Sequence, residues 1–192
     1  MIKKFAFTIN ELMIAAVVVG IIASITVPSI FANYNQKAWD TKTNIFAGHL
    51  HDALKEMRIN KALKGQETTE NFVSNFSSYT KLDKICDTNA LENCFAEKFI
   101  WDDETVSVKN ISSANDLGKT SWGTNVLGIK FGNGVSALLA YNPNCANDIK
   151  LIRNSNGDNQ LQTDCLAIIF DVSEFNRPNQ FGKDIRTFNA EH

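Results

Sequence analysis

The sequence is short of proline and of basic charge, and it has no closely spaced cysteine pair. Its 19 lysines and arginines are outnumbered by 21 acidic side chains, which gives a formal net charge of −2. This balance argues against a generic nucleic-acid-binding surface, so we expect no specific nucleic-acid partner. The lack of a Cys-x-x-Cys motif argues against a zinc site. Only three prolines occur, and none interrupts residues 29–64, so a helix can extend through that stretch.

The sequence also has little that suggests catalysis. Asp102, Asp103 and Glu104 form a tight acidic cluster, and paired carboxylates can perform acid–base chemistry. No histidine lies near them in the sequence, and charge clusters are usually solvated surface features. His49 and His51 are two residues apart, which places them on different faces of a helix rather than together as a metal pair. We therefore expect a protein that is not an enzyme, with these groups at its surface.

The most informative stretch is a long apolar segment near the N-terminus. Residues 12–32 are interrupted only by Ser24, Thr26, Pro28 and Ser29. At about 1.5 Å per residue, this segment spans roughly 30 Å as a helix, which is the thickness of a bilayer core. Glu11 comes directly before it, and a carboxylate left unpaired in lipid costs several kcal/mol. Glu11 therefore needs a cation, and the nearest candidate is a free amino terminus of this chain or of a neighbour.

The first 32 residues resemble the N-terminus of type IV prepilins and type II secretion pseudopilins. The features that carry the resemblance are the leader lysines Lys3 and Lys4, the small residue Ala6, the stretch Phe7-Thr8-Ile9-Asn10-Glu11, and Gly20 and Pro28 in the apolar segment. The resemblance implies that a prepilin peptidase cleaves between Ala6 and Phe7 and methylates the new amine. Glu11 then becomes the fifth residue of the mature chain. The chain departs from the family at Ala6, where glycine is usual, and at Asn10, which is more polar than usual.

The resemblance also implies a function and partners. The expected protein is a minor structural subunit of a type IV pilus (fimbrium) or of a type II secretion pseudopilus. Membrane lipid would hold it before an inner-membrane assembly platform adds it to a helical fibre of pilin or pseudopilin subunits, including copies of itself. Glu11 would set the register by pairing with a neighbour's N-terminal ammonium. Pro28 lies where such helices often kink.

The leader lysines also predict the orientation in the membrane. By the positive-inside rule, Lys3 and Lys4 stay in the cytoplasm, and everything after Ala32 lies outside. Their removal would leave 17 basic against 21 acidic side chains, a charge of −4. We expect a single-pass protein of the cytoplasmic (inner) membrane that later enters a periplasmic pseudopilus or a cell-surface pilus.

Other interpretations of the N-terminus remain open. A secretory signal peptide also has a basic start and an apolar core, and residues 27–29 could serve as its cleavage site. A carboxylate at the head of the apolar segment is unfavourable for such a signal, and the helical pattern continues past residue 32. The second interpretation is a plain single-pass anchor. The alternative function is an anchored or secreted binding domain, of adhesin or DNA-uptake tip type, that does not polymerise.

The cysteines predict two disulfides. The four cysteines all follow the apolar segment, and an even number in an exported domain favours disulfide bonds. Three pairings are available to four cysteines. Because short loops close most readily, we expect Cys86 to pair with Cys94 and Cys145 to pair with Cys165.

Residues 33–64 continue the helical pattern on one side only. Apolar residues recur at spacings of three, four and seven, while charged residues occupy the other side; the apolar positions are Trp39, Phe46, Leu50, Ala53, Leu54 and Met57. Gly65 directly follows and suits the position after a helix end. The prediction is a leader at residues 1–6 and one helix from Phe7 to Lys64. Its first half, residues 7–32, is the membrane-spanning and fibre-core segment, and residues 33–64 are amphipathic.

The rest of the chain predicts a sheet. Residues 65–125 are irregular and form a variable connecting region, with a short helix near Phe72, Phe76 and Tyr79. Residues 126–192 hold an antiparallel sheet and a C-terminal tail. Its expected strands lie at residues 126–131, 135–141, 149–153 and 165–172. The fold class is α+β, with a long helix packed on a sheet of about four strands, which the pilin resemblance also implies.

The tail offers oxygen ligands at Asp171, Ser173, Glu174 and Asp184. Their spacing matches no recognised calcium loop. A turn that covers the sheet edge is the commoner arrangement, so we expect no cofactor, with Ca²⁺ as the alternative.

Overall fold

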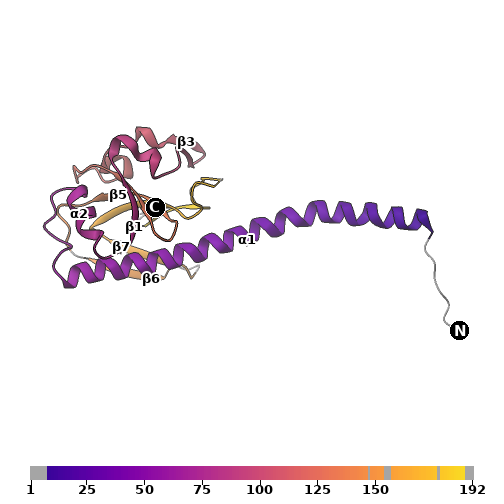
Figure 1. Ribbon diagram of the computed structural model, residues 1–192, viewed down its shortest axis with the longest axis horizontal. Helices are drawn as coiled ribbons and strands as arrows, with labels where there is room; N and C mark the ends of the chain where they lie inside the picture. Colours follow the sequence, from indigo (N-terminus) through magenta and orange to yellow (C-terminus); the bar gives the residue numbers. More distant parts are fainter. Residues whose placement is uncertain (1–7, 147, 154–156, 177, 189–192) are drawn as a thin grey trace. The chain divides into compact units, whose positions relative to one another are not determined.

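The computed structural model describes residues 8–146, 148–153, 157–176 and 178–188. The chain forms two compact units, the first ending at Ala38 and the second beginning at Trp39. A single helix, α1, contributes to both units (Figure 1). Together with an antiparallel sheet in the second unit, it confirms the predicted α+β class.

The elements are, in chain order, α1 (Ile9–Ile59), α2 (Thr69–Phe76), β1 (Leu82–Cys86), the 3₁₀ helix η1 (Thr88–Asn93), β2 (Lys98–Trp101), β3 (Glu104–Ser107), the 3₁₀ helices η2 (Val108–Asn110) and η3 (Ala114–Leu117), β4 (Leu127–Phe131), β5 (Ser136–Tyr141), β6 (Ile149–Arg153), β7 (Asn159–Thr163), β8 (Leu166–Asp171) and β9 (Ile185–Phe188).

The first unit consists of the N-terminal half of α1. Its large apolar side chains from Ile9 to Phe31 are 45% to 74% exposed and face every direction around the helix. The helix continues through Pro28. Ser24 Oγ and Thr26 Oγ1 donate to the carbonyl oxygens of Ile21 and Ile22 at 2.8 and 2.9 Å, so these two hydroxyls are satisfied by their own helix. This segment is long and apolar enough to cross a membrane.

The second half of α1 ends earlier than predicted, at Ile59 instead of Lys64. Lys61 adopts the left-handed conformation with φ 59°, where glycine is usual. Its N–H donates to the Arg58 carbonyl at 3.1 Å, and the Ala62 N–H donates to the Met57 carbonyl at 2.8 Å. This pair of bonds is a Schellman motif, so the helix stops four residues before Gly65.

The main sheet has five antiparallel strands in the order β1-β4-β5-β8-β9. The predicted hairpin is present as β4 and β5, and the predicted strand near residues 165–172 is β8. The prediction for residues 149–153 is wrong in one respect. They form a strand, β6, but it pairs with β7 in a separate two-stranded sheet, while β5 pairs directly with β8.

The two outer strands of the main sheet come from regions predicted to be irregular. β1 belongs to the connecting region and has only Cys86 buried, so it shows no alternating pattern. β9 belongs to the tail, and only its end residues, Ile185 and Phe188, are buried. Edge strands are half-solvated, and their sequences therefore carry a weaker periodic signal than central strands.

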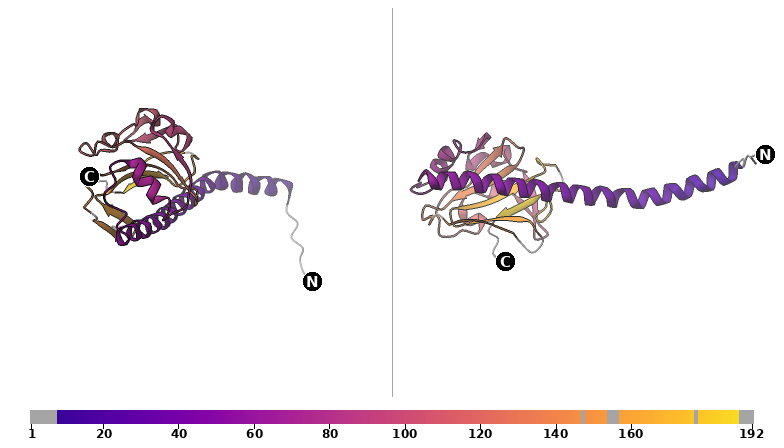
Figure 2. Two further views of the ribbon diagram at one scale, coloured as in Figure 1. Left: turned by 60° about the vertical axis from the view of Figure 1, so that its left-hand side comes forward. Right: turned by 90° about the horizontal axis from the view of Figure 1, so that it is seen from below.

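One face of the main sheet packs against the second half of α1 and against α2, as the ribbon views show (Figure 2). Phe46 of α1 is 1% exposed, and its ring centroid lies 4.9 Å from that of Phe131 and 4.9 Å from that of Phe170. The Tyr141 hydroxyl donates to the Leu63 carbonyl at 2.7 Å and fixes the chain just after α1. The amphipathic prediction for this half of α1 therefore corresponds to its packing on the sheet.

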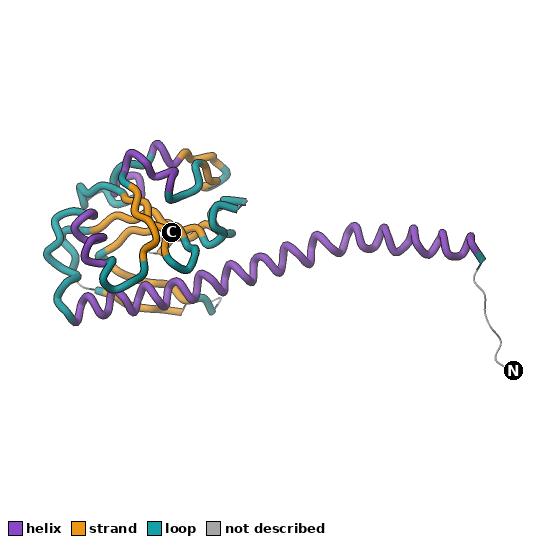
Figure 3. The backbone as a smooth tube through the Cα atoms, in the orientation of Figure 1, coloured by secondary structure: helices purple, strands orange, loops and turns teal. Residues whose placement is uncertain are grey.

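The other face is covered by the connecting region. Loops, short 3₁₀ helices and the β2–β3 hairpin form this layer (Figure 3). They bury a second apolar cluster that includes Leu91, Phe95, Phe99, Val108 and Ile111 against Leu138 and Ile169 of the sheet. The sheet is therefore covered on both faces rather than on one.

Candidate functional site

The start of α1 is the first candidate site. Thr8 precedes the helix, and its N–H and hydroxyl both lie 2.8 Å from Glu11 Oε2. The Glu11 N–H in turn donates to Thr8 Oγ1 at 3.3 Å. This is a reciprocal capping box, in which each residue satisfies a backbone N–H that the helix leaves free.

The capping box changes how Glu11 is understood. The sequence suggested that this carboxylate needs a cation, but the structure gives Oε2 two donors on its own chain. None of the ion pairs formed within residues 8–188, apart from the gaps noted above, includes Glu11. The hydrogen bonds satisfy one oxygen, and the negative charge stays available to a partner outside this chain.

Thr8 is the functional residue that the sequence analysis missed. The signal was present, because Thr-x-x-Glu directly before an apolar run is the signature of a capping box. The predicted processing residues Lys3, Lys4, Ala6 and Phe7 lie outside the described residues. Thr8 is thus the first described residue, and cleavage after Ala6 would put the new amine on its direct neighbour.

Both disulfides have the predicted pairing. Cys86 at the end of β1 is bonded to Cys94 just after η1, which ties the second layer to the sheet edge. Cys145, in the connection after β5, is bonded to Cys165 just before β8. All four cysteines are buried. Cys145, Cys165 and Asp164 lie close enough to hold a metal ion, but both sulfurs are in the disulfide, so no thiolate ligand is available.

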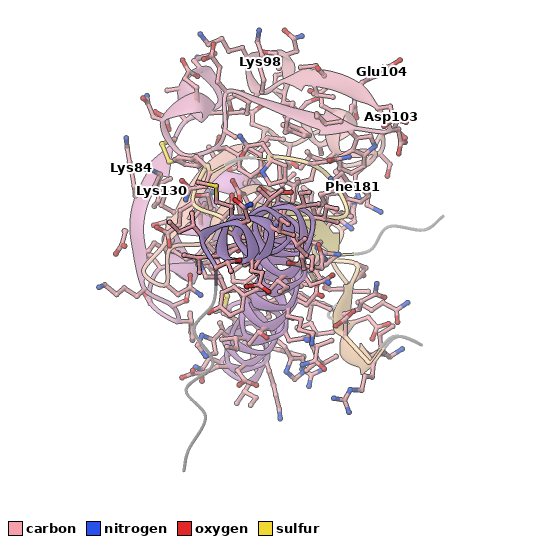
Figure 4. All side chains as sticks on the ribbon, turned by 90° about the vertical axis from the view of Figure 1, so that its right-hand side faces the viewer. Lys84, Lys98, Asp103, Glu104, Lys130 and Phe181 are labelled. Atoms are coloured by element: carbon pink, nitrogen blue, oxygen red, sulfur yellow. A yellow bond between two sulfur atoms is a disulfide. The ribbon has the colours of Figure 1, made fainter. Side chains whose placement is uncertain are left out.

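The acidic cluster lies at a hairpin tip. Asp102 and Asp103 have φ 48° and 64° and form the turn between β2 and β3. Positive φ at both central residues is typical of a two-residue hairpin turn. All three carboxylates are exposed, and Asp103 and Glu104 point away from the protein (Figure 4). The expected solvated loop is confirmed.

The two histidines lie on α1. His49 is exposed, and His51 Nδ1 is 3.3 Å from Asp52 Oδ1. The side chain of His51 is less exposed than expected for a solvated residue, at 21%. Neither histidine belongs to a group of potential metal ligands among the described residues.

The tail carboxylates serve as loop anchors. Asp171 is fully buried and accepts the N–H groups of Ser173 and Phe175 at 2.7 and 3.1 Å. Asp184, also fully buried, accepts the N–H groups of Asn179 and Gln180, both at 2.8 Å. Burial raises the pKa of the Asp171 carboxyl, against the lowering effect of the Ser173 hydrogen bonds.

These residues do not assemble a calcium site. Glu174 is directed to Lys42, with 3.7 Å between Oε1 and Nζ. Within the described residues, no group of converging acidic ligands includes Asp171, Glu174 or Asp184. The tail instead forms the loop and edge strand that complete the sheet, so the ligand set does not fit Ca²⁺.

Comparisons of this chain with protein families, with curated proteins and with solved structures find no match.

Proposed function

We propose that this protein is a pilin-like or pseudopilin-like structural subunit. A prepilin peptidase processes it, the cytoplasmic membrane holds it by α1, and an assembly platform adds it to a helical fibre. The observation that carries the proposal is the capped start of α1, where a Thr8–Glu11 box opens a helix that is apolar and exposed on every side. The N-terminal sequence pattern around it resembles the prepilin motif, and the second unit is an α+β domain held by two disulfides.

The exposed half of α1 cannot remain in water. Thirteen large apolar side chains between Ile9 and Phe31 are exposed. At about 1.5–3 kcal/mol for each buried side chain, their removal from water is worth on the order of 20–40 kcal/mol. Lipid provides this burial before assembly, and equivalent helices of other subunits provide it afterwards. An apolar surface around the whole helix suits both environments, because neither requires a special polar face.

Glu11 gives this uniform surface a defined register. The capping box occupies Oε2, and the remaining carboxylate charge would attract the N-terminal ammonium of a neighbouring processed subunit. A subunit placed one turn too high or too low would bury the charge without its partner, which costs several kcal/mol. Cleavage after Ala6 is required for this pairing, because it creates the amine directly before Thr8.

The decisive experiment identifies the N-terminus of the mature protein. The full chain is expressed with and without a prepilin peptidase, purified from membranes and analysed by intact-mass and N-terminal peptide mass spectrometry. We expect a chain that begins at methylated Phe7 only when the peptidase is present. A start near Ile30 would identify a signal peptide, and an intact Met1 would identify a plain anchor; either result overturns the proposal.

Ala6 provides the matched variants for this experiment. Ala6→Gly should preserve or speed cleavage, because glycine lets the backbone enter an extended protease cleft. Ala6→Leu should slow cleavage, because it places a large side chain where the motif has a small one. Equal processing of both variants would argue against a prepilin peptidase site.

A further inference from the structure

The second unit contains a cleft that the proposed fibre role does not use. It has a volume of about 530 Å³, within the range of small-molecule sites. One wall is the β6–β7 hairpin and the other is the loop that follows η3. The residues that matter for the inference are Trp122, Ile152, Gln160, Gln162, Asp164 and Lys119.

The hairpin wall is fixed to the domain core. The Cys145–Cys165 disulfide joins the segments that flank the hairpin on both sides. The Asp164 carboxylate accepts the N–H groups of Ala146 and Asp148 at 2.6 and 3.2 Å, and the Asn142 side chain donates to the Asp164 carbonyl at 2.8 Å. These links hold the cleft open in the absence of any ligand, so binding needs little reorganisation.

The opposite wall is fixed in a similar way. The Ser113 and Asp116 side chains cap η3, and Gly118 ends it at φ 76°. The Ala114 N–H donates to the Thr124 carbonyl at 2.8 Å, and the Thr124 hydroxyl donates to the Tyr141 carbonyl at 2.7 Å. The intervening loop, which carries Trp122, is therefore anchored at both ends.

The lining combines an aromatic surface with side-chain amides. Trp122 is half-buried in one wall, and Ile152 is 42% exposed in the other. Ile152 lies opposite Gln160 in the β6–β7 register, so both side chains, with Gln162 two residues on, share one face of the hairpin. The amides of Gln160 and Gln162 make no hydrogen bond with any other described residue. They offer both donors and acceptors to a ligand.

The charges at the cleft are balanced. Lys150 Nζ lies 3.2 Å from Asp148 Oδ2, and the Asp164 carboxylate is held by backbone N–H groups. The Lys119 ammonium lies 5.9 Å from the centroid of the Trp122 ring, within cation–π range. This pattern does not favour phosphate groups or nucleic acid, which are bound by an excess of positive charge. It favours a neutral polar ligand.

We propose that this cleft binds a neutral glycan. A pyranose ring has an apolar face of C–H groups, which would pack on the Trp122 ring, and hydroxyls around its edge, each both a donor and an acceptor. The amides of Gln160 and Gln162 match such hydroxyls, because each amide also donates and accepts. The inference does not depend on fibre assembly, since every residue of the cleft belongs to the second unit.

The test measures binding of soluble neutral oligosaccharides to the full chain. The protein is placed in lipid nanodiscs, because alkyl-glycoside detergents would themselves compete. Maltohexaose, cellohexaose and chitohexaose are titrated by isothermal calorimetry. We expect saturable binding of at least one, and a rise in Kd of about tenfold or more for Trp122→Ala. Trp122→Tyr should retain part of the affinity, and the double variant Gln160→Ala, Gln162→Ala should lose as much as Trp122→Ala.

Leu151→Ala is the matched control. Leu151 is adjacent to Ile152 and comparably exposed, at 37%, but lies on the opposite face of the hairpin and does not line the cleft. This variant should bind as the wild type does, while Ile152→Ala should bind more weakly. Thermal melting of each variant shows whether it is folded. No saturable binding up to about 10 mM sugar, or equal binding by folded Trp122→Ala, overturns the proposal. So does tighter binding of a peptide or an oligonucleotide that competes at the same residues.

Discussion

The two halves of α1 share one backbone conformation and differ in every other respect. From Ile9 to Phe31 the apolar side chains surround the helix and are exposed, whereas from Phe46 to Met57 they occupy one side and are buried on the sheet. The first half is rich in valine and isoleucine, which favour helices only weakly in water. An apolar medium changes this preference, because only a helix satisfies all the backbone groups of a single segment. The comparison shows that one continuous helix can be stabilised by two different environments.

The largest expected effect comes from emptying the core beneath the second half of α1. Phe46→Ala should destabilise the second unit by about 3–5 kcal/mol, because Phe46 contacts the rings of Phe131, Phe170 and Phe188. Phe31→Ala is the matched change in the first half, and it should leave the stability of the second unit unchanged. Urea unfolding in nanodiscs, followed by near-ultraviolet circular dichroism, measures both. Equal losses for the two variants would show that the halves do not have separate roles.

The next effect comes from the disulfides, which lie only in the second unit. Replacing Cys145 and Cys165 by serine should cost about 3 kcal/mol, and replacing Cys86 and Cys94 about 2.5 kcal/mol, because the longer loop gains more entropy when the chain unfolds. The sequence separations are 20 and 8 residues. The same unfolding measurement compares the two double variants. Membrane retention through α1 should not change in either, and its loss would contradict the separation of the two regions.

Patterns that arise within one element could be predicted from the sequence. The length and two-sided character of α1, the β4–β5 hairpin and the β8 strand each follow from local periodicity. The disulfide pairing followed from loop length. Features that depend on contacts between distant segments were missed. β1 and β9 are strands because they pair with β4 and β8, and their own sequences show little alternation.

The helix ends illustrate the same limit. A rule that prefers glycine after a helix pointed to Gly65, but the Schellman bonds at Lys61 end α1 earlier. At the other end, the Thr8–Glu11 box was readable from the sequence and was missed, because Glu11 was considered only as a charge in lipid. The glycan cleft had no sequence signal, since Trp122 and Gln160 are brought together only by the fold.

A smaller effect distinguishes two buried or capping carboxylates of the second unit by pH. The pKa of Asp171 is raised by burial, so the folded state binds a proton more tightly than the unfolded state. Stability should therefore fall as the pH rises from the unfolded pKa to the folded pKa of Asp171. The pKa of Asp116 is lowered, mainly by the Ser113 and Ser112 N–H groups, so its contribution is lost as the pH falls below the unfolded pKa.

Asn substitutions separate the two contributions. Asp171→Asn should remove the loss of stability on raising the pH through the Asp171 titration. Asp116→Asn should remove the loss on lowering the pH, in the acidic range. Urea midpoints measured across the acidic and neutral range test both. The same pH profile for Asp171→Asn and the wild type would show that Asp171 does not titrate in the folded protein as its burial implies.

The smallest effect on the fold, and the sharpest test of the first half of α1, comes from Glu11→Gln. Glutamine at this position still completes a capping box with Thr8, so the helix start should be preserved and the second unit should be as stable as in the wild type. Only the charge is removed. Membrane insertion should be normal or easier, because a neutral side chain is less costly in lipid. Fibre incorporation should fall sharply, because a neighbour's ammonium loses its partner. Thr8→Val is the reciprocal control, since it removes the hydroxyl of the box, at a cost of about 0.5–2 kcal/mol, and keeps the charge. The measurement is the ratio of membrane-held to fibre-incorporated subunit, quantified for this subunit itself in cells with the assembly machinery. If Glu11→Gln gives a normal ratio and Thr8→Val lowers it, Glu11 serves the helix start alone and the proposed pairing with a neighbouring subunit is wrong.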